Sequence, residues 1–300
     1  MKKFRLYQVD SFTTDLFRGN PAGVVPDADG LTAVQMQAIA REMNNSETAF
    51  ILPPSSTDHE VWIRFFTPTT EVPSCGHATI AAHYVRARER ALPSCRVVQK
   101  IGAGILPVDI VREGDDYRVI MTQGAPKFGE PVAGKQRDDI IAALGLHKAD
   151  MNPKCPMQVV STGHSKVLVG IRRRMMLNRL KPDFAWLAEL SQKIKCNGYF
   201  VFTLVQDSGK VLSHGRMFAP AIGIPEDPVT GNANGPLGAY LVEHGLVPAA
   251  GSSFTFQGQQ GEAMGRPGTV DVIVEIENGK PVTVRVGGRA VIVYNSEIAL

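Results

Sequence analysis

A thiol, a glycine and an imidazole stand together in the stretch PSCGHATIAAHY, at Cys75, Gly76 and His77. Three kinds of chemistry fit these residue types. Cysteine and histidine are metal ligands, a histidine can activate a cysteine nucleophile, and the N-terminus of a helix binds anions. The alanine-rich run that follows predicts a helix beginning here, which favours anion binding. Cys75 also fits a small buried hydrophobic residue, and His77 an ordinary polar one.

The remaining cysteines argue against a metal centre. Residues 95, 155 and 196 lie far apart, with no CxxC pair and no metal-ligand spacing. We therefore predict no metal. Single, scattered cysteines are typical of a reducing compartment, so we expect a cytoplasmic protein.

Charge and hydropathy exclude two classes of partner. The net charge of +3 over 300 residues leaves no basic stripe for a nucleic acid, and residues 172–174 (Arg-Arg-Arg) fit a solvated surface. No apolar run approaches the roughly 18 residues of a membrane span. The opening MKKFRLYQVDSF lacks the apolar core of a signal peptide.

Glu47 is the candidate acid or base. In REMNNSETAFIL it lies between a predicted helix end and a short apolar strand. A carboxylate at the mouth of a buried strand would be partly desolvated, which suits general acid–base catalysis. The alternative is a solvated carboxylate, or an ion-pair partner for Arg41 or Arg64.

A second polar group follows at IPEDPVTGNANG, where Asp227 could accept or relay a proton beside Thr230 and Asn232. Helix capping and a Pro turn are the structural alternatives for these residues. Asn20, in FRGNPAGVV, marks a turn before a strand and carries little information by itself. No motif for a nucleotide, a phosphate loop, a zinc protease or a serine hydrolase is found, so we expect no cofactor.

The chain contains an internal repeat. RFFTPTTEVPSCGHATIAAHY (64–84) matches RMFAPAIGIPEDPVTGNANGPLGAY (216–240), and the match pairs Gly76 with Gly231 and His77 with Asn232. Upstream, ETAFIL (47–52) and NGYFVF (197–202) are short apolar strands in the same order. The repeat predicts two related halves.

Strands in succession with few helices predict an α+β fold with mainly antiparallel sheets. We place one domain at residues 1–120 and the other at 121–300, with the strand near 285–300 expected to pack back on the first. Helices at about 77–91 and 232–244 are apolar, and each is expected inside its own half's sheet. Each follows a glycine turn, so their free N–H groups, facing across a cleft, would bind a carboxylate.

Four motifs together resemble the PhzF-like isomerase family of phenazine biosynthesis, and its YddE-type bacterial members in particular. They are QVDSFTTDLFRGNPAGVV, SETAFIL, RFFTPTTEVPSCGHAT and EDPVTGNA, and they extend over most of the chain. The resemblance implies the diaminopimelate epimerase-like fold, in which two pseudo-symmetric domains each wrap a barrel-like sheet around a central helix. The ligand then binds in the cleft between them. We also expect a homodimer.

The resemblance assigns catalytic roles to Glu47, His77 and Asp227. The cysteine pair of the related epimerases falls on Cys75 and Thr230, so a two-thiol mechanism is not expected. Ala78 replaces the family's usual Pro and Asn232 its usual Ser, so the phenazine precursor is not carried over as substrate.

The expected activity is cofactor-independent isomerisation or epimerisation of a small carboxylic acid. Glu47, His77 and Asp227 are expected to act as catalytic residues. Substrate-binding positions are expected at Asn20, Cys75, Gly76, Thr230, Gly231 and Asn232. Two alternatives stay open: a non-catalytic protein that binds a small acid, and a thiol racemase that uses Cys75.

Overall fold

The computed structural model describes residues 1–205, 211–247 and 251–300. The chain forms two compact units. Unit 1 comprises Met1–Thr122 with Gly287–Leu300, and unit 2 comprises Gln123–Val286. The division falls within the long last strand, β17 (Lys280–Ala299), so the end of the chain belongs to the unit in which the chain begins.

The elements of unit 1 are β1 (Lys3–Ser11), β2 (Asn20–Val25), α1 (Ala33–Met43), β3 (Thr48–Leu52), β4 (Val61–Phe66), β5 (Glu71–Val72), α2 (Gly76–Arg90), β6 (Cys95–Ile101), β7 (Gly104–Glu113) and β8 (Asp116–Thr122). The helices of unit 2 are α3 (Gly134–Ala143), α4 (Arg174–Leu177), α5 (Phe184–Ile194) and α6 (Gly231–Glu243), with single 3₁₀ turns at Lys148–Asp150, Pro220–Ile222 and Glu262–Met264. Its strands are β9 (Lys127–Pro131), β10 (Gln158–Ser161), β11 (Lys166–Gly170), β12 (Tyr199–Leu204), β13 (Val211–Ala219), β14 (Ile224–Asp227), β15 (Ser253–Gln260) and β16 (Gly268–Glu277).

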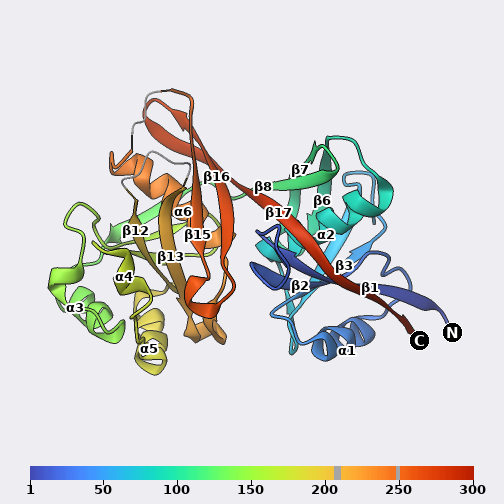
Figure 1. Ribbon diagram of the computed structural model, residues 1–300, viewed down its shortest axis with the longest axis horizontal. Helices are drawn as coiled ribbons and strands as arrows, with labels where there is room; N and C mark the ends of the chain where they lie inside the picture. The colour runs from blue at the N-terminus through green and yellow to red at the C-terminus, as the bar shows by residue number, and fades with distance from the viewer. Residues whose placement is uncertain (206–210, 248–250) are drawn as a thin grey trace. The chain divides into compact units, whose positions relative to one another are not determined.

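The sheet of unit 1 closes on itself around α2. Strand β1 pairs with β2, β2 with β3, β3 with β4, β4 with β6, β6 with β7 and β7 with β8. Strand β17 completes the ring, because it pairs with both β1 and β8. Figure 1 shows α2 enclosed by these strands. Helix α1 packs outside the ring in a separate apolar cluster with residues that include Phe4, Phe50 and Phe66.

Unit 2 repeats this design around α6. Strands β9 to β13 pair in chain order, β13 then pairs with β15, and β15 with β16. The backbone N–H of Gln123 donates to the carbonyl of Val284 at 2.9 Å, which joins the start of this unit to β17. Helices α3 and α5 contribute to a second apolar cluster on the outer face of the sheet.

The central helices are buried because small or apolar residues occupy almost every face. In α6, a Cβ on Gly238 would lie 2.8 Å from both Val272 and Val274, so only glycine lets the strand and helix approach this closely. Within the described residues, no helix is both long and apolar enough to cross a membrane.

The predicted antiparallel character holds for most strand pairs whose register the described residues give, and four of those pairs are parallel: β2–β3, β4–β6, β11–β12 and β13–β15. Each parallel pair is connected through a helical segment, because a parallel connection must return the chain to the same end of the sheet. The α+β assignment is confirmed, with these crossovers added.

The internal repeat extends to individual side chains. Arg64 holds Glu71 through two N–O contacts of 2.7 Å, and Arg216 holds Glu226 through contacts of 2.8 and 2.7 Å. Each guanidinium also lies about 5 Å from the ring of the Phe two residues later, at 5.1 and 5.0 Å. In both units this ion pair links the strand before the central helix to the segment from which the helix begins.

Candidate active site

Three of the predicted residues form one cluster in unit 1. The Nε2 atom of His77 lies 3.3 Å from Glu47 Oε2 and 3.2 Å from Ser46 Oγ. On the same ring, Nδ1 lies 3.5 Å from the sulfur of Cys75. The Glu47 side chain is 13% exposed and that of His77 is 8% exposed. A carboxylate, an imidazole and a thiol therefore share a largely buried site.

Glu47 reaches this cluster through the connection between α1 and β3. Helix α1 ends at Asn44, which adopts the left-handed conformation that closes many helices. The Glu47 carbonyl then accepts a hydrogen bond from Gly23 of β2 at 3.2 Å, which fixes the backbone at the mouth of β3. The predicted place of Glu47, between a helix and a buried strand, is the one observed.

Cys75 and His77 are held by the first turn of α2. Cys75 is the N-cap, and its side chain makes no capping hydrogen bond. The hydroxyl of Thr79 donates to the Cys75 carbonyl at 2.7 Å, and Ser11 of β1 donates to the His77 carbonyl at 2.8 Å. Asn20, which is 1% exposed, pairs with Ser11 in the β1–β2 ladder. These contacts anchor the beginning of α2 to the surrounding sheet.

The donor atoms of Glu47, Cys75 and His77 all lie within 4.8 Å of one another, a spacing that a metal ion could also use. The same atoms can move protons. His77 Nε2 lies within reach of Glu47 Oε2, a buried oxygen that accepts no hydrogen bond from the described residues, while Nδ1 faces the Cys75 thiol. Acid–base, thiol and metal chemistry thus converge on the same three side chains.

The remaining predicted residues form a second cluster at the start of α6 in unit 2. The Thr230 hydroxyl donates to the Asp227 carboxylate, although Thr230 makes no capping hydrogen bond to α6. The Gln260 amide binds the Asp227 carbonyl at 2.7 Å and the Thr230 hydroxyl at 3.0 Å. Thr230 thus orients the Asp227 side chain and does not cap α6, which was the structural alternative for this residue.

Asn232, one residue after the first residue of α6, Gly231, belongs to a further chain of amides. The Gln123 amide donates to Asn232 Oδ1 at 2.8 Å, and Gln123 in turn accepts from the Thr162 hydroxyl at 2.7 Å. Ser46, Gln123, Thr162 and Gln260 were not predicted as site residues. Only Ser46 had a signal in the sequence, because it immediately precedes Glu47.

His83 and the basic run at residues 172–174 belong to neither cluster, and residues 172–174 are exposed, as expected for a solvated surface. His83 is fully buried in α2, bonded to Gln99 at 2.9 Å, and burial lowers its pKa to about 4. In the basic run, Arg172 donates to the Met151 carbonyl at 2.9 Å and Arg174 pairs with Glu262 at 2.5 Å. Two of the three arginines are therefore engaged by the protein itself.

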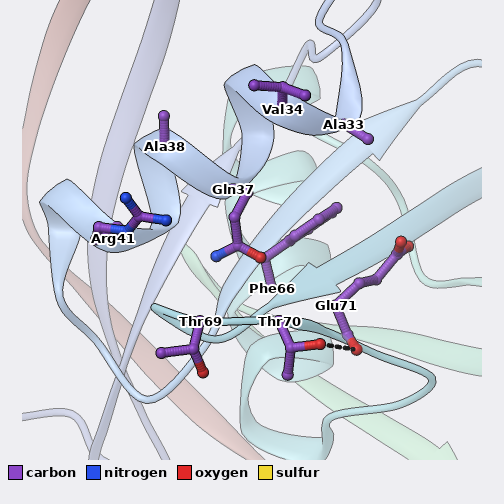
Figure 2. Close-up of a pocket in the computed structure, with 9 residues that line it drawn as sticks. All are labelled: Ala33, Val34, Gln37, Ala38, Arg41, Phe66, Thr69, Thr70 and Glu71. Carbon is purple, nitrogen blue, oxygen red and sulfur yellow. Dashed lines mark hydrogen bonds between the residues drawn. The ribbon is translucent and has the colours of Figure 1, made fainter.

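A cavity of about 450 Å³ lies between α1 and the loop before β5 (Figure 2). Ala33, Val34 and Ala38 supply apolar walls. The Gln37 amide donates to the Thr67 carbonyl at 2.8 Å, and Glu71 is held by Arg64. None of the predicted site residues lines this cavity, and its polar groups are engaged in binding the protein's own atoms.

The architecture and the two clusters agree with the relationships of the sequence. Residues 9–296 match the family model described as phenazine biosynthesis-like protein. The chain belongs to this PhzF family. It is 55% identical to an uncharacterised isomerase of Clostridium acetobutylicum, over 100% of this chain and 99% of that protein. It is 51% identical to the uncharacterised isomerase YddE of Salmonella typhimurium, over 99% of both chains.

Solved structures extend the comparison. A phenazine biosynthesis protein of the PhzF family from Bacillus anthracis superposes with a TM-score of 0.87 at 32% identity, with all of both chains covered. A hydroxyproline epimerase from Agrobacterium vitis, with bound trans-4-hydroxy-L-proline, shares the fold with a TM-score of 0.65 at 13% identity, over 99% of this chain and 93% of that one. The fold is thus the diaminopimelate epimerase-like fold expected from the sequence motifs.

Proposed function

We propose that this protein is a cofactor-independent isomerase or epimerase of a small carboxylic acid, which acts by proton transfer at carbon. The observation that carries the proposal is the pairing of Glu47 Oε2 with His77 Nε2 at 3.3 Å, at the N-terminus of α2. A base that removes a proton from carbon must be close to its substrate and shielded from bulk water. Glu47, at 13% exposure, meets the second condition.

The proposed mechanism assigns each group one task. The substrate carboxylate binds the free N–H groups at the beginning of α2, where the helix dipole stabilises negative charge that develops during proton removal. Glu47 takes the proton from carbon and returns it to another position or to the other face of the carbon. His77 holds Glu47 in place and shares the transfer. In unit 2, Asp227, held by the Thr230 hydroxyl, is the second acid to which we assign a catalytic role.

A thiol mechanism is the second candidate, because Cys75 Sγ lies 3.5 Å from His77 Nδ1. In that mechanism His77 would take the thiol proton and Cys75 would become the base. Thr230 stands at the equivalent position of unit 2, so a partner thiol is missing there. A protein that only binds its acid is the third reading, and it differs from both enzymes in catalysing no exchange.

Deuterium uptake distinguishes the three readings. Small amino, hydroxy and unsaturated acids are incubated with the protein in heavy water, and exchange at carbon is followed by ¹H NMR. For an acid that exchanges, Glu47→Gln should lower the rate by on the order of 10²-fold or more, because the amide keeps the shape of glutamate and cannot accept the proton. Cys75→Ala should cost far less, because its sulfur is not the base.

The controls are built into the same assay. Both variants are first checked by circular dichroism and by binding of the unreacted acid, which should be largely retained. Full exchange in Glu47→Gln together with an inactive Cys75→Ala would assign the reaction to the thiol. Saturable binding of an acid without any exchange in the wild-type protein would establish the binding protein instead.

A further inference from the structure

Lys166, the first residue of β11, is buried to an extent unusual for a lysine. The residue is 2% exposed. Among the described residues the only hydrogen bond of its side chain is a long one, 3.5 Å, from Nζ to the carbonyl of its neighbour Ser165. An ammonium group has three N–H donors, and a buried cation is normally paired with an acid at close range. The side chain therefore has donor capacity that the protein itself does not use.

The alternation of β11 places Lys166 on the inner face of the sheet. Val167 and Val169 belong to the outer cluster beneath α3 and α5. Lys166 and Gly170 consequently point to the opposite face. On that face Gly170 contacts the ring of Phe202, which packs edge-on against Tyr240 of α6. The lysine thus faces the side of the sheet that α6 covers.

Its electrostatic neighbours place it near the beginning of α6. Burial lowers the pKa of Lys166 to about 8, and the charges of Asp227 and Cys196 act in the opposite direction. Asp227 is the acid held by Thr230, four residues before α6 begins. Burial and, to a smaller extent, the Lys166 charge lower the pKa of His164, on the segment that leads into β11. Lys166 therefore adds a cation to the polar cluster already described.

The duplication shows that this cation is specific to unit 2. In the parallel pair β2–β3, Gly23 lies opposite Thr48, and in the equivalent pair β11–β12, Val167 lies opposite Tyr199. Lys166 therefore corresponds to Ala22, the residue before Gly23. Ala22 is fully buried and apolar. The fold does not require a charge at this place, so a stabilising role for the lysine does not explain it.

We propose that Lys166 binds an anionic oxygen group of a small ligand, and that this ligand is a short dicarboxylic acid, one carboxylate of which pairs with this lysine. The identification of the ligand with the substrate rests on the proposed function above; the binding of an anion at Lys166 does not. A carboxylate would supply the acceptor that the ammonium lacks, and Asp227 alongside would disfavour a group of higher negative charge.

The test compares dicarboxylic and monocarboxylic acids of equal chain length, such as glutarate and valerate, by isothermal titration calorimetry at pH 7. The wild-type protein should bind the dicarboxylic acid at least about tenfold more tightly. Lys166→Met, which keeps the length of the side chain and removes the charge, should abolish this preference and leave monocarboxylate affinity unchanged. Lys135→Met removes a lysine whose side chain is 87% exposed and should behave as wild type.

The outcomes separate this inference from the proposed activity. An undiminished preference for glutarate in Lys166→Met, or no preference in the wild type, would overturn the assignment. Inorganic phosphate is titrated in parallel, and Lys166-dependent binding of phosphate without glutarate would replace the dicarboxylate. Glu47→Gln should retain the preference even though it loses exchange, so failure of catalysis leaves the binding test intact. Lys166→Met should remain folded by circular dichroism, since methionine suits a buried position.

Discussion

The roles of His77 depend on which of its contacts operates during the reaction. Nε2 is shared between Ser46 and Glu47, and Nδ1 faces Cys75. One imidazole can therefore support a carboxylate base or activate a thiol, and a metal ion would compete for the same atoms. The geometry of the cluster thus permits a carboxylate base, a thiol base or a bound metal ion. In the proposed function, Glu47 is the base.

The effect of metal ions on proton exchange can be predicted from the same three side chains. Dialysis against EDTA should leave proton exchange unchanged, because the carboxylate and the imidazole themselves accept and donate the proton. Added Zn²⁺ should inhibit, because the three donor atoms lie within 4.8 Å of one another. Cys75→Ala should weaken that inhibition by removing one ligand. Loss of exchange on EDTA treatment, restored by a divalent metal, would contradict the prediction.

At the scale of elements, each central helix begins at a cluster of candidate site residues and has a buried body. Helix α2 starts at the cluster, with Cys75 as its N-cap and His77 in its first turn, and carries His83 in the interior six residues further along. His83 is neutral because burial lowers its pKa to about 4, with its Nε2 bonded to Gln99. Its environment thus disfavours the charged form. The stability of α2 should therefore depend on pH in a defined direction.

The folded pKa of His83 lies below the value of about 6.5 expected in the unfolded chain. The contribution of neutral His83 is therefore complete above pH 6.5 and is lost progressively as the pH falls toward 4. His83→Gln removes this titration. Over that range, the free energy of unfolding of the wild type should decrease more steeply than that of the variant, by up to roughly 1.4 kcal/mol per pH unit. Urea unfolding at pH 7, 6 and 5 measures the difference, and parallel slopes would show that His83 does not titrate.

At the scale of the whole molecule, the two units share the same scaffold contacts but differ in their candidate site residues. The ion pairs Arg64–Glu71 and Arg216–Glu226 repeat, and so do the bonds by which Thr79 and Asn234 return to the carbonyl of the N-cap residue. The proposed catalytic residue Glu47 does not repeat. Gly23 donates to the Glu47 carbonyl, and the equivalent Val167 donates to the Gly198 carbonyl at 2.8 Å. Gly198 of unit 2 therefore occupies the position equivalent to Glu47 of unit 1.

A side chain cannot be added at that place in unit 2. A Cβ on Gly198 would lie 2.4 Å from the backbone oxygen of Phe218. Gly198→Ala should therefore lower the free energy of unfolding by more than about 2 kcal/mol, because backbone must move to relieve the overlap. Glu47→Ala is the matched control at the equivalent position and should leave the protein folded while removing activity. Urea unfolding of both variants tests this, and equal stabilities would refute the assigned equivalence.

The amino-acid sequence determined the features that are local in the chain. The Pro/Gly turns fixed where α2 and α6 begin, and the repeated order of Arg, Phe and Pro revealed the duplication before any contact was known. The four motifs also identified the family, which the comparisons confirm. Helix starts are encoded by neighbouring residues, so short stretches of sequence suffice to predict them.

Only the tertiary structure decided which distant residues meet. Glu47 and His77 are 30 positions apart, and their contact depends on the register of β2 with β3 and on the bond from Ser11 to the first turn of α2. Lys166 illustrates the same limit. In STGHSKVLVG it reads as an ordinary polar residue at the start of a strand, and the closed sheet around α6 makes it a buried cation. Burial and pairing are properties of long-range packing, which local sequence patterns do not specify.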